Sequence, residues 1–292
     1  MLISEFIKKN TQYLLSTNQT DEREVQTILR FLIEDTLQIN RIDFSSRFLT
    51  QQEIEFLNQS VERLKNNEPL QHITKKAYFY GLDLEVSPNV LIPRPETEEL
   101  VHQILKDFEN RKENKEIFLE VGTGSGCISI ALAKNLPNFH FIAIDISEKA
   151  LEIAKKNAKK NNVENIEFLQ LNFLDKEEVR NCKAIKNITH IVSNPPYIKE
   201  NEKATMSANV LDYEPHIALF VENTNPLIFY KAIAEFFTNT TVNKNSFLYV
   251  EVNQYLAKET KELFISFGLE NCIIFKDLQE NLRFVRATYE SF

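Results

Sequence analysis

Four consecutive residues, Asn194-Pro195-Pro196-Tyr197, are of the types needed to hold a primary amino group. Proline keeps the backbone extended and has no N–H, so Pro195 and Pro196 leave carbonyl acceptors. Asn194 adds a side-chain carbonyl, and Tyr197 an aromatic wall. Two fixed acceptors can bind both hydrogens of an amide or nucleobase NH₂ and aim its nitrogen at an electrophile. We therefore predict that Asn194, Pro195, Pro196 and Tyr197 bind the substrate and take part in transfer to nitrogen.

A glycine-rich segment, Gly122-Thr123-Gly124-Ser125-Gly126, lies between an apolar run and a helical pattern. Glycine permits a tight turn and close approach of a ligand, and the helix start offers free N–H groups. Asp145 ends the next predicted strand, about 20 residues further on, where a carboxylate can bind ribose hydroxyls. We therefore predict that this loop and Asp145 bind a nucleoside cofactor.

The spacing of the glycines limits which nucleoside cofactor the loop can bind. The fingerprint of NAD-binding proteins requires a third glycine where this chain has Ser129 or Cys127, depending on where the count begins. No Gly-Lys-Ser/Thr follows, which excludes a Walker loop. The loop, with Glu120 just before it, instead resembles the S-adenosylmethionine loop of class I methyltransferases.

Strands and helices must alternate to position these two segments. Apolar runs predict strands at 117–121, 141–144, 166–171, 188–192, 247–252, 273–275 and 284–288. Helical patterns occupy 128–136, 147–160, 226–237 and 256–267. This alternation predicts a largely parallel, doubly wound α/β domain, with ligands bound beyond the carboxyl ends of the strands.

The first part of the chain follows a different period. Val25, Ile28, Leu29 and Leu32 mark one buried helix face, so residues 1–75 are predicted to be a helical bundle. Residues 82–86 alternate as a strand does, and 90–92 suggest a second strand of a hairpin. The predicted division is a helical bundle (1–75), a β-hairpin linker (76–97) and an α/β domain (98–292).

The motifs together resemble one family. Asn-Pro-Pro-Tyr is similar to the signature of amino-group methyltransferases acting on DNA adenine, rRNA guanine or protein glutamine. Residues 81–100, GLDLEVSPNVLIPRPETEEL, resemble the linker of the release-factor glutamine N5-methyltransferases, the HemK type. The block Glu120–Ile128 and the ending Lys276-Asp277-Leu278 fit the same family. The likeness covers essentially the whole chain.

This resemblance implies a Rossmann-like class I methyltransferase that uses S-adenosylmethionine, with a small helical domain and a linking hairpin. It implies that the substrate is the glutamine of the Gly-Gly-Gln motif in class-1 peptide chain release factors, and that residues 1–75 help to hold the factor. By position, the cofactor would contact Gly122, Thr123, Gly124, Ser125, Gly126, Asp145, Asn172, Phe173 and Asn194. The substrate would contact Asn194, Pro195, Pro196, Tyr197, Arg94, Glu96 and Thr97. The chain departs from the family at Asn172, where an acid is common, and at Asn253 and Glu280, where glycine is usual.

Composition bounds the remaining possibilities. Lys and Arg number 34 against 42 Asp and Glu, a net charge of −8, which argues against a bulk nucleic-acid binder. Five scattered histidines and three distant cysteines show no metal spacing, and the cysteines fit a reducing compartment. No apolar run approaches the roughly 18 residues of a membrane helix, and the first residues do not resemble a signal peptide, so we expect a cytoplasmic protein away from membranes.

Three alternative functions remain open at this point. The substrate could be a glutamine of a ribosomal protein, because such enzymes share the four-residue motif. It could be a nucleic-acid amino group, although phosphate contacts need Lys and Arg. The chain could also be a binding module that keeps the fold without catalysis, which the intact loop and Asn194–Tyr197 segment disfavour.

Overall fold

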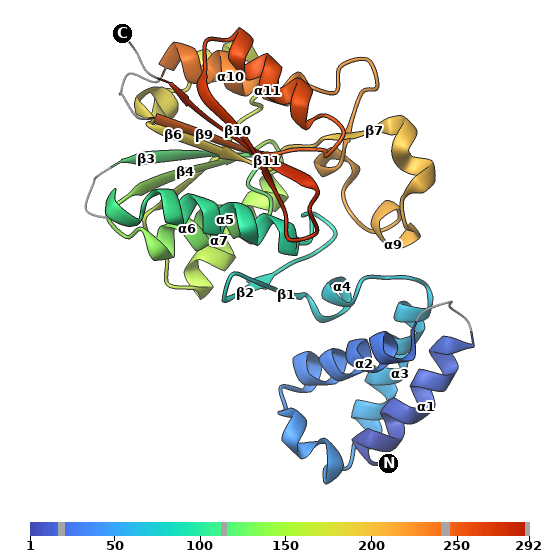
Figure 1. Ribbon diagram of the computed structural model, residues 1–292. Coiled ribbons are helices and arrows are strands. Elements are labelled where there is room, and N and C mark those ends of the chain that lie inside the picture. Colours follow the sequence, from blue (N-terminus) through green and yellow to red (C-terminus); the bar gives the residue numbers. More distant parts are fainter. Residues whose placement is uncertain (17–20, 112–115, 241–245, 290–292) are drawn as a thin grey trace. The chain divides into compact units, whose positions relative to one another are not determined.

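The protein is described by a computed structural model that covers residues 1–16, 21–111, 116–240 and 246–289 (Figure 1). Its contacts divide it into two compact units. One unit comprises Met1–Lys76 and Ser207–Tyr213, and the other comprises Ala77–Met206 and Glu214–Phe292. The boundaries predicted from the sequence, at residues 75 and 97, remain predictions.

The first unit is helical and has its own apolar core. The buried positions of the predicted helix face, Val25, Leu29 and Leu32, pack within that core, and Ile28 is partly exposed at its edge. Asp21 and Thr50 cap two of the helix starts with their side chains, and the Thr50 hydroxyl accepts a hydrogen bond from the Glu53 N–H at 3.2 Å. Its helices are α1 (Ile3–Leu15), α2 (Glu22–Leu37), the 3₁₀ turn Arg41–Ser45, α3 (Gln51–Lys65), α4 (Leu70–Thr74) and α9 (Ala208–Leu211).

The hairpin lies earlier in the chain than predicted. It consists of β1 (Lys76–Phe79) and β2 (Leu82–Glu85). Tyr80 and Gly81 between them both have positive φ, which suits the two-residue turn of a tight hairpin. The predicted second strand at 90–92 is wrong. The Ile92 N–H donates to the Glu214 carboxylate at 3.1 Å and so has no strand partner.

A seven-stranded sheet forms the centre of the second unit. Its strand order is β10-β11-β9-β6-β3-β4-β5, and all neighbours are parallel except those involving β11. The chain runs from β3 to β4 and β5 on one side of β3 and then crosses back to β6 on the other side. The direction of the crossovers therefore reverses between β3 and β6, which is the switch point of the sheet. The strands are β3 (Ile117–Val121), β4 (His140–Asp145), β5 (Ile166–Gln170), β6 (His190–Ser193), β9 (Ser246–Glu251), β10 (Glu270–Lys276) and β11 (Leu282–Tyr289).

Helices cover both faces of this sheet (Figure 1). One face is covered by α5 (Pro95–Asp107), α6 (Cys127–Asn135) and α7 (Glu148–Lys160), and the other by α10 (Ile228–Thr240) and α11 (Ala257–Ser266). Alternate residues of β3 enter different cores: Phe118 packs in the cluster of α5 and α6, while Leu119 and Val121 pack in the cluster of α10 and α11. The predicted doubly wound α/β arrangement is confirmed, and burial on both faces explains why its strands are continuous apolar runs.

Shorter elements complete the second unit. Between the larger ones lie the 3₁₀ turns Glu109–Arg111, Ala184–Asn187, Glu200–Thr205 and His216–Ala218, the helix α8 (Lys176–Asn181), and the small parallel pair β7 (Ile198–Lys199) and β8 (Phe220–Val221).

The turn from β3 to α6 uses two glycines for different reasons. Gly124 and Gly126 both have left-handed backbones, with φ of 55° and 81°. A Cβ on Gly126 would lie 2.9 Å from Ile130 Cδ1 and 3.1 Å from Ala154 Cβ, whereas a Cβ on Gly124 would meet nothing within 4 Å. Gly126 therefore allows α6 to pack against α7, and Gly124 leaves the backbone accessible to a ligand.

This difference predicts unequal costs of substitution. Gly124→Ala should lower the free energy of unfolding by about 1–2 kcal/mol, the cost of a left-handed alanine. Gly126→Ala should lose a further ~1–3 kcal/mol because the new methyl overpacks the contact with Ile130 and Ala154. Urea denaturation followed by circular dichroism measures both values, and equal losses would contradict the packing role of Gly126.

Candidate active site

A cavity of about 320 Å³ opens at the carboxyl ends of the central strands. It lies at the switch point of the sheet, where open α/β sheets bind ligands. It is lined by most of the predicted site residues, namely Arg94, Thr97, Gly122, Thr123, Gly124, Ser125, Asp145, Asn172, Phe173, Asn194, Pro195 and Pro196. Glu96, Gly126 and Tyr197 are not among the lining residues.

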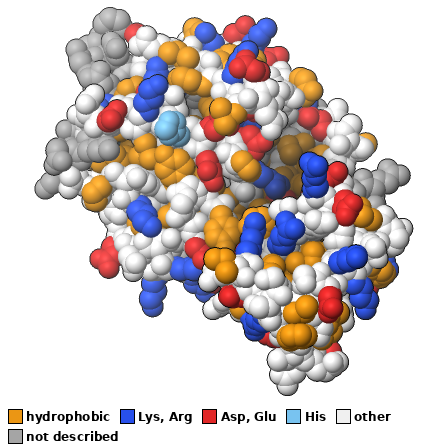
Figure 2. Space-filling view, turned by 60° about the horizontal axis from the view of Figure 1, so that its bottom comes forward, with side chains coloured by type: hydrophobic (Ala, Val, Ile, Leu, Met, Phe, Trp, Pro, Cys, Tyr) orange, Lys and Arg blue, Asp and Glu red, His pale blue; other side chains and the backbone are white. Residues whose placement is uncertain are grey.

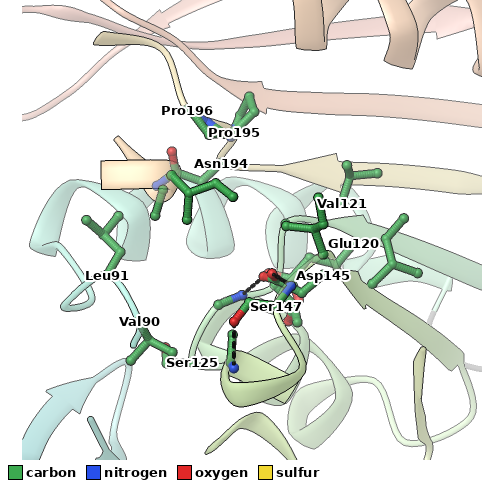
Figure 3. A pocket seen from close by; sticks show the side chains of 18 of the residues that line it. Val90, Leu91, Glu120, Val121, Ser125, Asp145, Ser147, Asn194, Pro195 and Pro196 are labelled. Carbon is green, nitrogen blue, oxygen red and sulfur yellow. Dashed lines mark hydrogen bonds between the residues drawn. The ribbon is translucent and has the colours of Figure 1, made fainter. Parts of the chain in front are cut away.

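Figure 3 shows how these residues surround the cavity. Asn194, Pro195 and Pro196 lie on one side, and Asp145 with Ser147 on the opposite side. Val90 and Leu91, which the sequence analysis did not assign to the site, form a third side. The Asn194–Pro196 segment and the glycine loop with Asp145 therefore border the same cavity.

Asp145 and the glycine loop are held together by hydrogen bonds. Asp145 Oδ2 accepts from the Gly124 N–H at 2.8 Å, and Oδ1 accepts from the Ser147 N–H at 2.9 Å (Figure 3). Burial raises the pKa of Asp145, and these backbone donors oppose the rise. Each carboxylate oxygen has further acceptor capacity, so Asp145 can also bind ribose hydroxyls.

A hydrogen bond from Asn157 of α7 holds the glycine loop in place. This buried side chain donates from Nδ2 to the Ser125 carbonyl at 2.9 Å and to the Glu85 carbonyl at 2.9 Å, while its Oδ1 accepts from the Glu85 N–H at 2.6 Å. All of its hydrogen-bonding groups thus join the hairpin to the glycine loop. This contact joins residues distant in the chain, so local sequence patterns do not predict it.

Glu120 lies buried at the end of β3, directly before the loop. Its Oε2 accepts hydrogen bonds from the Thr123 hydroxyl at 2.6 Å, from the Ser129 N–H at 3.2 Å, and from the Ser129 hydroxyl. Desolvation raises the pKa of Glu120 to about 7, although these donors oppose the rise. An acid that ionises near neutral pH thus lines the cavity.

The remaining part of the cavity is apolar. Phe173 is buried and meets Phe236 edge to face, with 5.3 Å between ring centroids. Leu171, Leu174 and Phe229 line the same cavity. The contact of Phe173 with adenine stays a prediction. The Asn172 side-chain oxygen accepts from the Leu174 N–H at 3.1 Å and so helps to shape this segment.

The Asn194 segment is supported by a buried acid. Asn194 Nδ2 donates to Thr97 Oγ1 at 3.2 Å, and Thr97 Oγ1 donates to Glu251 Oε2 at 2.7 Å. The Tyr197 hydroxyl donates to the other oxygen of Glu251 at 3.0 Å. Tyr197 packs against the core that contains α10 and α11. It therefore supports the segment from behind, and the predicted role of Tyr197 as an aromatic wall of the cavity is wrong.

Sequence reasoning missed Glu251. A signal was available, because this acid is the next-to-last residue of the predicted strand at 247–252 and so lies near the carboxyl edge that carries the site. Glu96, in the first turn of α5, acts on Glu251 through its charge, which favours a higher pKa of that carboxyl. Its predicted direct contact with substrate stays a prediction.

The segment around Glu214, which follows β7, is held beside the cavity by an ion pair. Arg94 Nη2 lies 2.5 Å from Glu214 Oε1, and the Glu214 side chain is only 1% exposed. The next residues, Pro215, Ile217 and Ala218, line the cavity. The charge of Arg94 is thus compensated within the protein.

The two expected glycine positions near the C-terminus differ. Glu280 has φ of 66°, so the backbone is left-handed where the family carries glycine, and it turns from β10 into β11. Asn253 has no such backbone. Its Oδ1 accepts from the Tyr255 N–H at 3.0 Å.

Two further features bear on function. In the ranges that the structure describes, no group of three or more His, Cys, Asp or Glu side chains is placed to hold a metal ion. No helix within those same ranges is long and apolar enough to cross a membrane.

Comparisons with known proteins agree with this geometry. A family described as methyltransferase domain matches residues 112–220, and the PrmC N-terminal domain family matches residues 7–74. The hMettl16 catalytic domain shares the fold, with a TM-score of 0.58 at 15% identity over 90% of this chain and 92% of that one. The second unit thus has the class I methyltransferase fold.

Relatives in sequence are more specific. The release factor glutamine methyltransferase of Flavobacterium psychrophilum is 41% identical over 99% of this chain and 100% of its own length. That of Bacteroides thetaiotaomicron is 44% identical over 68% of each chain. Because one such relative aligns over its full length and the predicted motifs meet in one cavity, the chain belongs to the release factor glutamine methyltransferase family.

Proposed function

We propose that this protein transfers a methyl group from S-adenosylmethionine to the side-chain amide nitrogen, N5, of the glutamine in the Gly-Gly-Gln motif of class-1 peptide chain release factors. The observation that carries the proposal is the position of Asn194. Its amide lies in the same cavity as the glycine loop, with its NH₂ bound to Thr97. Its oxygen is therefore available to a substrate NH₂. Full-length relatives named for this reaction support the same conclusion.

The residues present fit the cofactor. Asp145 would hold the ribose, the open backbone at Gly124 would allow close approach, and Phe173 with its apolar neighbours would hold the adenine. S-adenosylmethionine, when bound, supplies a methyl group on a positively charged sulfur. Glu120 lines the same cavity with a carboxylate that complements this charge.

The remaining work of the protein is to prepare the amide nitrogen. An amide lone pair is delocalised, so the nitrogen is a poor nucleophile. Asn194 Oδ1 and the carbonyl oxygens of Pro195 and Pro196 would accept the two N–H hydrogens and orient the lone pair. Positive charge grows on nitrogen during transfer, so these acceptors stabilise the transition state more than the ground state. No general base is required before the nitrogen reacts.

Surface charge favours a protein substrate over a nucleic acid. On the face drawn in Figure 2, Lys and Arg side chains lie among Asp and Glu and hydrophobic side chains. Several basic side chains are paired with carboxylates, for example Lys160 with Asp83 at 2.8 Å and Lys176 with Glu235 at 2.7 Å. Paired lysines are less available for phosphate contacts.

We also propose the setting of the reaction. The helical unit, which includes the match to the PrmC N-terminal domain, would recognise the body of the release factor. The cytoplasm would be the compartment, since the substrate acts in translation and the three cysteines are free thiols.

One experiment separates the candidate substrates. Purified class-1 release factor, ribosomal proteins and nucleic acid should be incubated side by side with the enzyme and radiolabelled S-adenosylmethionine. Label should enter the release factor and disappear when its motif is changed from Gly-Gly-Gln to Gly-Gly-Ala. Label in ribosomal protein or nucleic acid alone would replace the proposed substrate, and no label in any of them would support a binding module.

The charge of Glu120 predicts that cofactor affinity depends on pH. Glu120 has a pKa of about 7 in the free protein, so it is mostly protonated below that pH. A positively charged cofactor favours the ionised form and lowers this pKa on binding. Affinity should therefore rise by up to about tenfold per pH unit below pH ~7 and level off above it.

Calorimetric titrations between about pH 6 and 8 measure this dependence. Glu120→Gln is the control, because it keeps the shape, cannot ionise, and reveals any titration of the cofactor itself. The same pH dependence in both proteins would exclude Glu120 as its source.

Asn194 should matter for the chemical step. Asn194→Ala removes the acceptor, so kcat and kcat/KM should fall together by about 10²–10³. Cofactor affinity should fall much less than kcat, because the loop and Asp145 are intact. Asn239→Ala, at an exposed position of α10, is the matched control. The measurement is the rate of single-turnover methylation at saturating concentrations of cofactor and substrate. A wild-type rate in Asn194→Ala would show that the Asn194 amide takes no part in the chemical step.

A further inference from the structure

Glu251 begins a chain of hydrogen bonds that ends at the reacting segment. Its carboxylate is 1% exposed. Oε2 accepts from Thr97 Oγ1 at 2.7 Å, and Thr97 Oγ1 in turn accepts from Asn194 Nδ2 at 3.2 Å. The three residues come from the end of β9, the first turn of α5 and the end of β6. Asn194 is the member of this series that would bind the reacting NH₂ group.

The shape of the side chains does not decide the direction of these hydrogen bonds. The oxygen and the NH₂ of an asparagine side chain are nearly the same size, so only hydrogen bonding decides which one faces the cavity. A threonine hydroxyl has one proton. The Thr97 hydroxyl donates that proton to Glu251 Oε2, so it has no proton left to donate to Asn194. Thr97 can then only accept from Asn194, which requires the Asn194 NH₂ on that side.

Reversal would leave a buried charge without its donor. If Thr97 donated to Asn194 Oδ1, Glu251 Oε2 would lose its hydrogen bond at a site that water does not reach. Tyr197 holds the opposite oxygen, Oε1, at 3.0 Å, so the carboxylate cannot turn to compensate. The arrangement therefore favours one orientation of the Asn194 amide.

We propose that Glu251 is a positioning residue that, through Thr97, orients the Asn194 amide so that its oxygen faces the substrate. The acceptor that selects an NH₂ group is thus specified by a buried carboxylate on another strand. In the reverse orientation Asn194 would present a donor, which suits a carboxylate or carbonyl and not the two hydrogens of an amide nitrogen. This inference deepens the proposed function and rests on it for its consequence in catalysis.

Burial and neighbouring groups act in opposite directions on the pKa of Glu251. Burial raises its pKa, and the charge of Glu96 acts in the same direction, while Thr97, Tyr197 and the positive charge of Arg283 oppose the rise. Tyr230 donates to the Glu251 backbone carbonyl at 3.0 Å, which fixes the strand end. The groups that feel the charge of Glu251 include the Cys127 thiol and the Tyr197 and Tyr230 hydroxyls. Burial raises the pKa of each, so these groups stay neutral.

Three variants test this chain of bonds. Glu251→Gln keeps the size but offers a donor beside an acceptor, so Thr97 can be bonded in either direction. Thr97→Val keeps the shape and removes the relay. Thr97→Ser restores the hydroxyl and is the matched partner of Thr97→Val.

The first measurement does not depend on activity. In protein labelled with ¹⁵N at asparagine, the wild-type Asn194 NH₂ should show a nuclear Overhauser effect to the Thr97 methyl. Glu251→Gln should weaken this effect. The same effect at full strength in Glu251→Gln, or its absence in the wild type, would overturn the inference.

The second measurement is single-turnover methylation of purified release factor. Glu251→Gln and Thr97→Val should each slow transfer by roughly tenfold or more, the scale of a misplaced reacting group. The double variant should be no slower than the slower single variant, and cofactor affinity should stay near the wild-type value. Thr97→Ser should recover most of the rate that Thr97→Val loses.

The outcomes separate this inference from the proposed function. Losses that add in the double variant, or that follow weaker cofactor binding, would indicate a merely structural role and overturn the inference. If Glu251→Gln does not fold, the pair Thr97→Val and Thr97→Ser decides by the same rate comparison. If the wild type does not methylate release factor, the proposed function fails, and the orientation of the Asn194 amide is still decided by the first measurement.

Discussion

The parallel register of three strands is the constraint on which the site depends. Val121 at the end of β3 is paired with Ile144 of β4 on one side and with Ser193 of β6 on the other. The next residues along each strand are Gly122, Asp145 and Asn194. Pairing therefore brings the cofactor loop, its acid and the amide-binding segment to the same level of the sheet. A slip of one residue in either pair would move a functional residue away from the edge and turn its neighbours into the wrong core.

Buried carboxylates position the parts of the site that the sheet does not. Glu120 gathers the donors of the glycine loop and of α6, Glu214 holds Arg94 and the Ile92 N–H, and Glu251 holds Thr97 and Tyr197. A buried charge is costly unless donors surround it, so each acid forces its donors into one arrangement. The same acids join segments far apart in the chain, such as Ile92 and Glu214. Precision at the cavity thus comes from polar contacts behind its surface.

The two units differ in the kinds of interaction that they contain. The helical unit is stabilised by an apolar core and by helix caps such as that at Thr50. The α/β unit carries in addition the buried acids of the site and the left-handed turns at Gly124 and Gly126. The site is therefore formed where segments distant in the sequence are joined by polar contacts of buried side chains.

The sequence by itself determined the strand and helix order, the doubly wound sheet, the glycine loop and the Asn194–Tyr197 segment. These follow from local periodicity and from short motifs, which need no knowledge of distant residues. It misplaced the second hairpin strand, because the fate of the Ile92 N–H depends on Glu214, more than a hundred residues away. Only the tertiary structure decided that Tyr197 lies behind the segment and that Glu251, Thr97 and Asn194 form one chain of hydrogen bonds. The direction of a hydrogen bond depends on which groups meet, and that is settled only when distant strands are packed together.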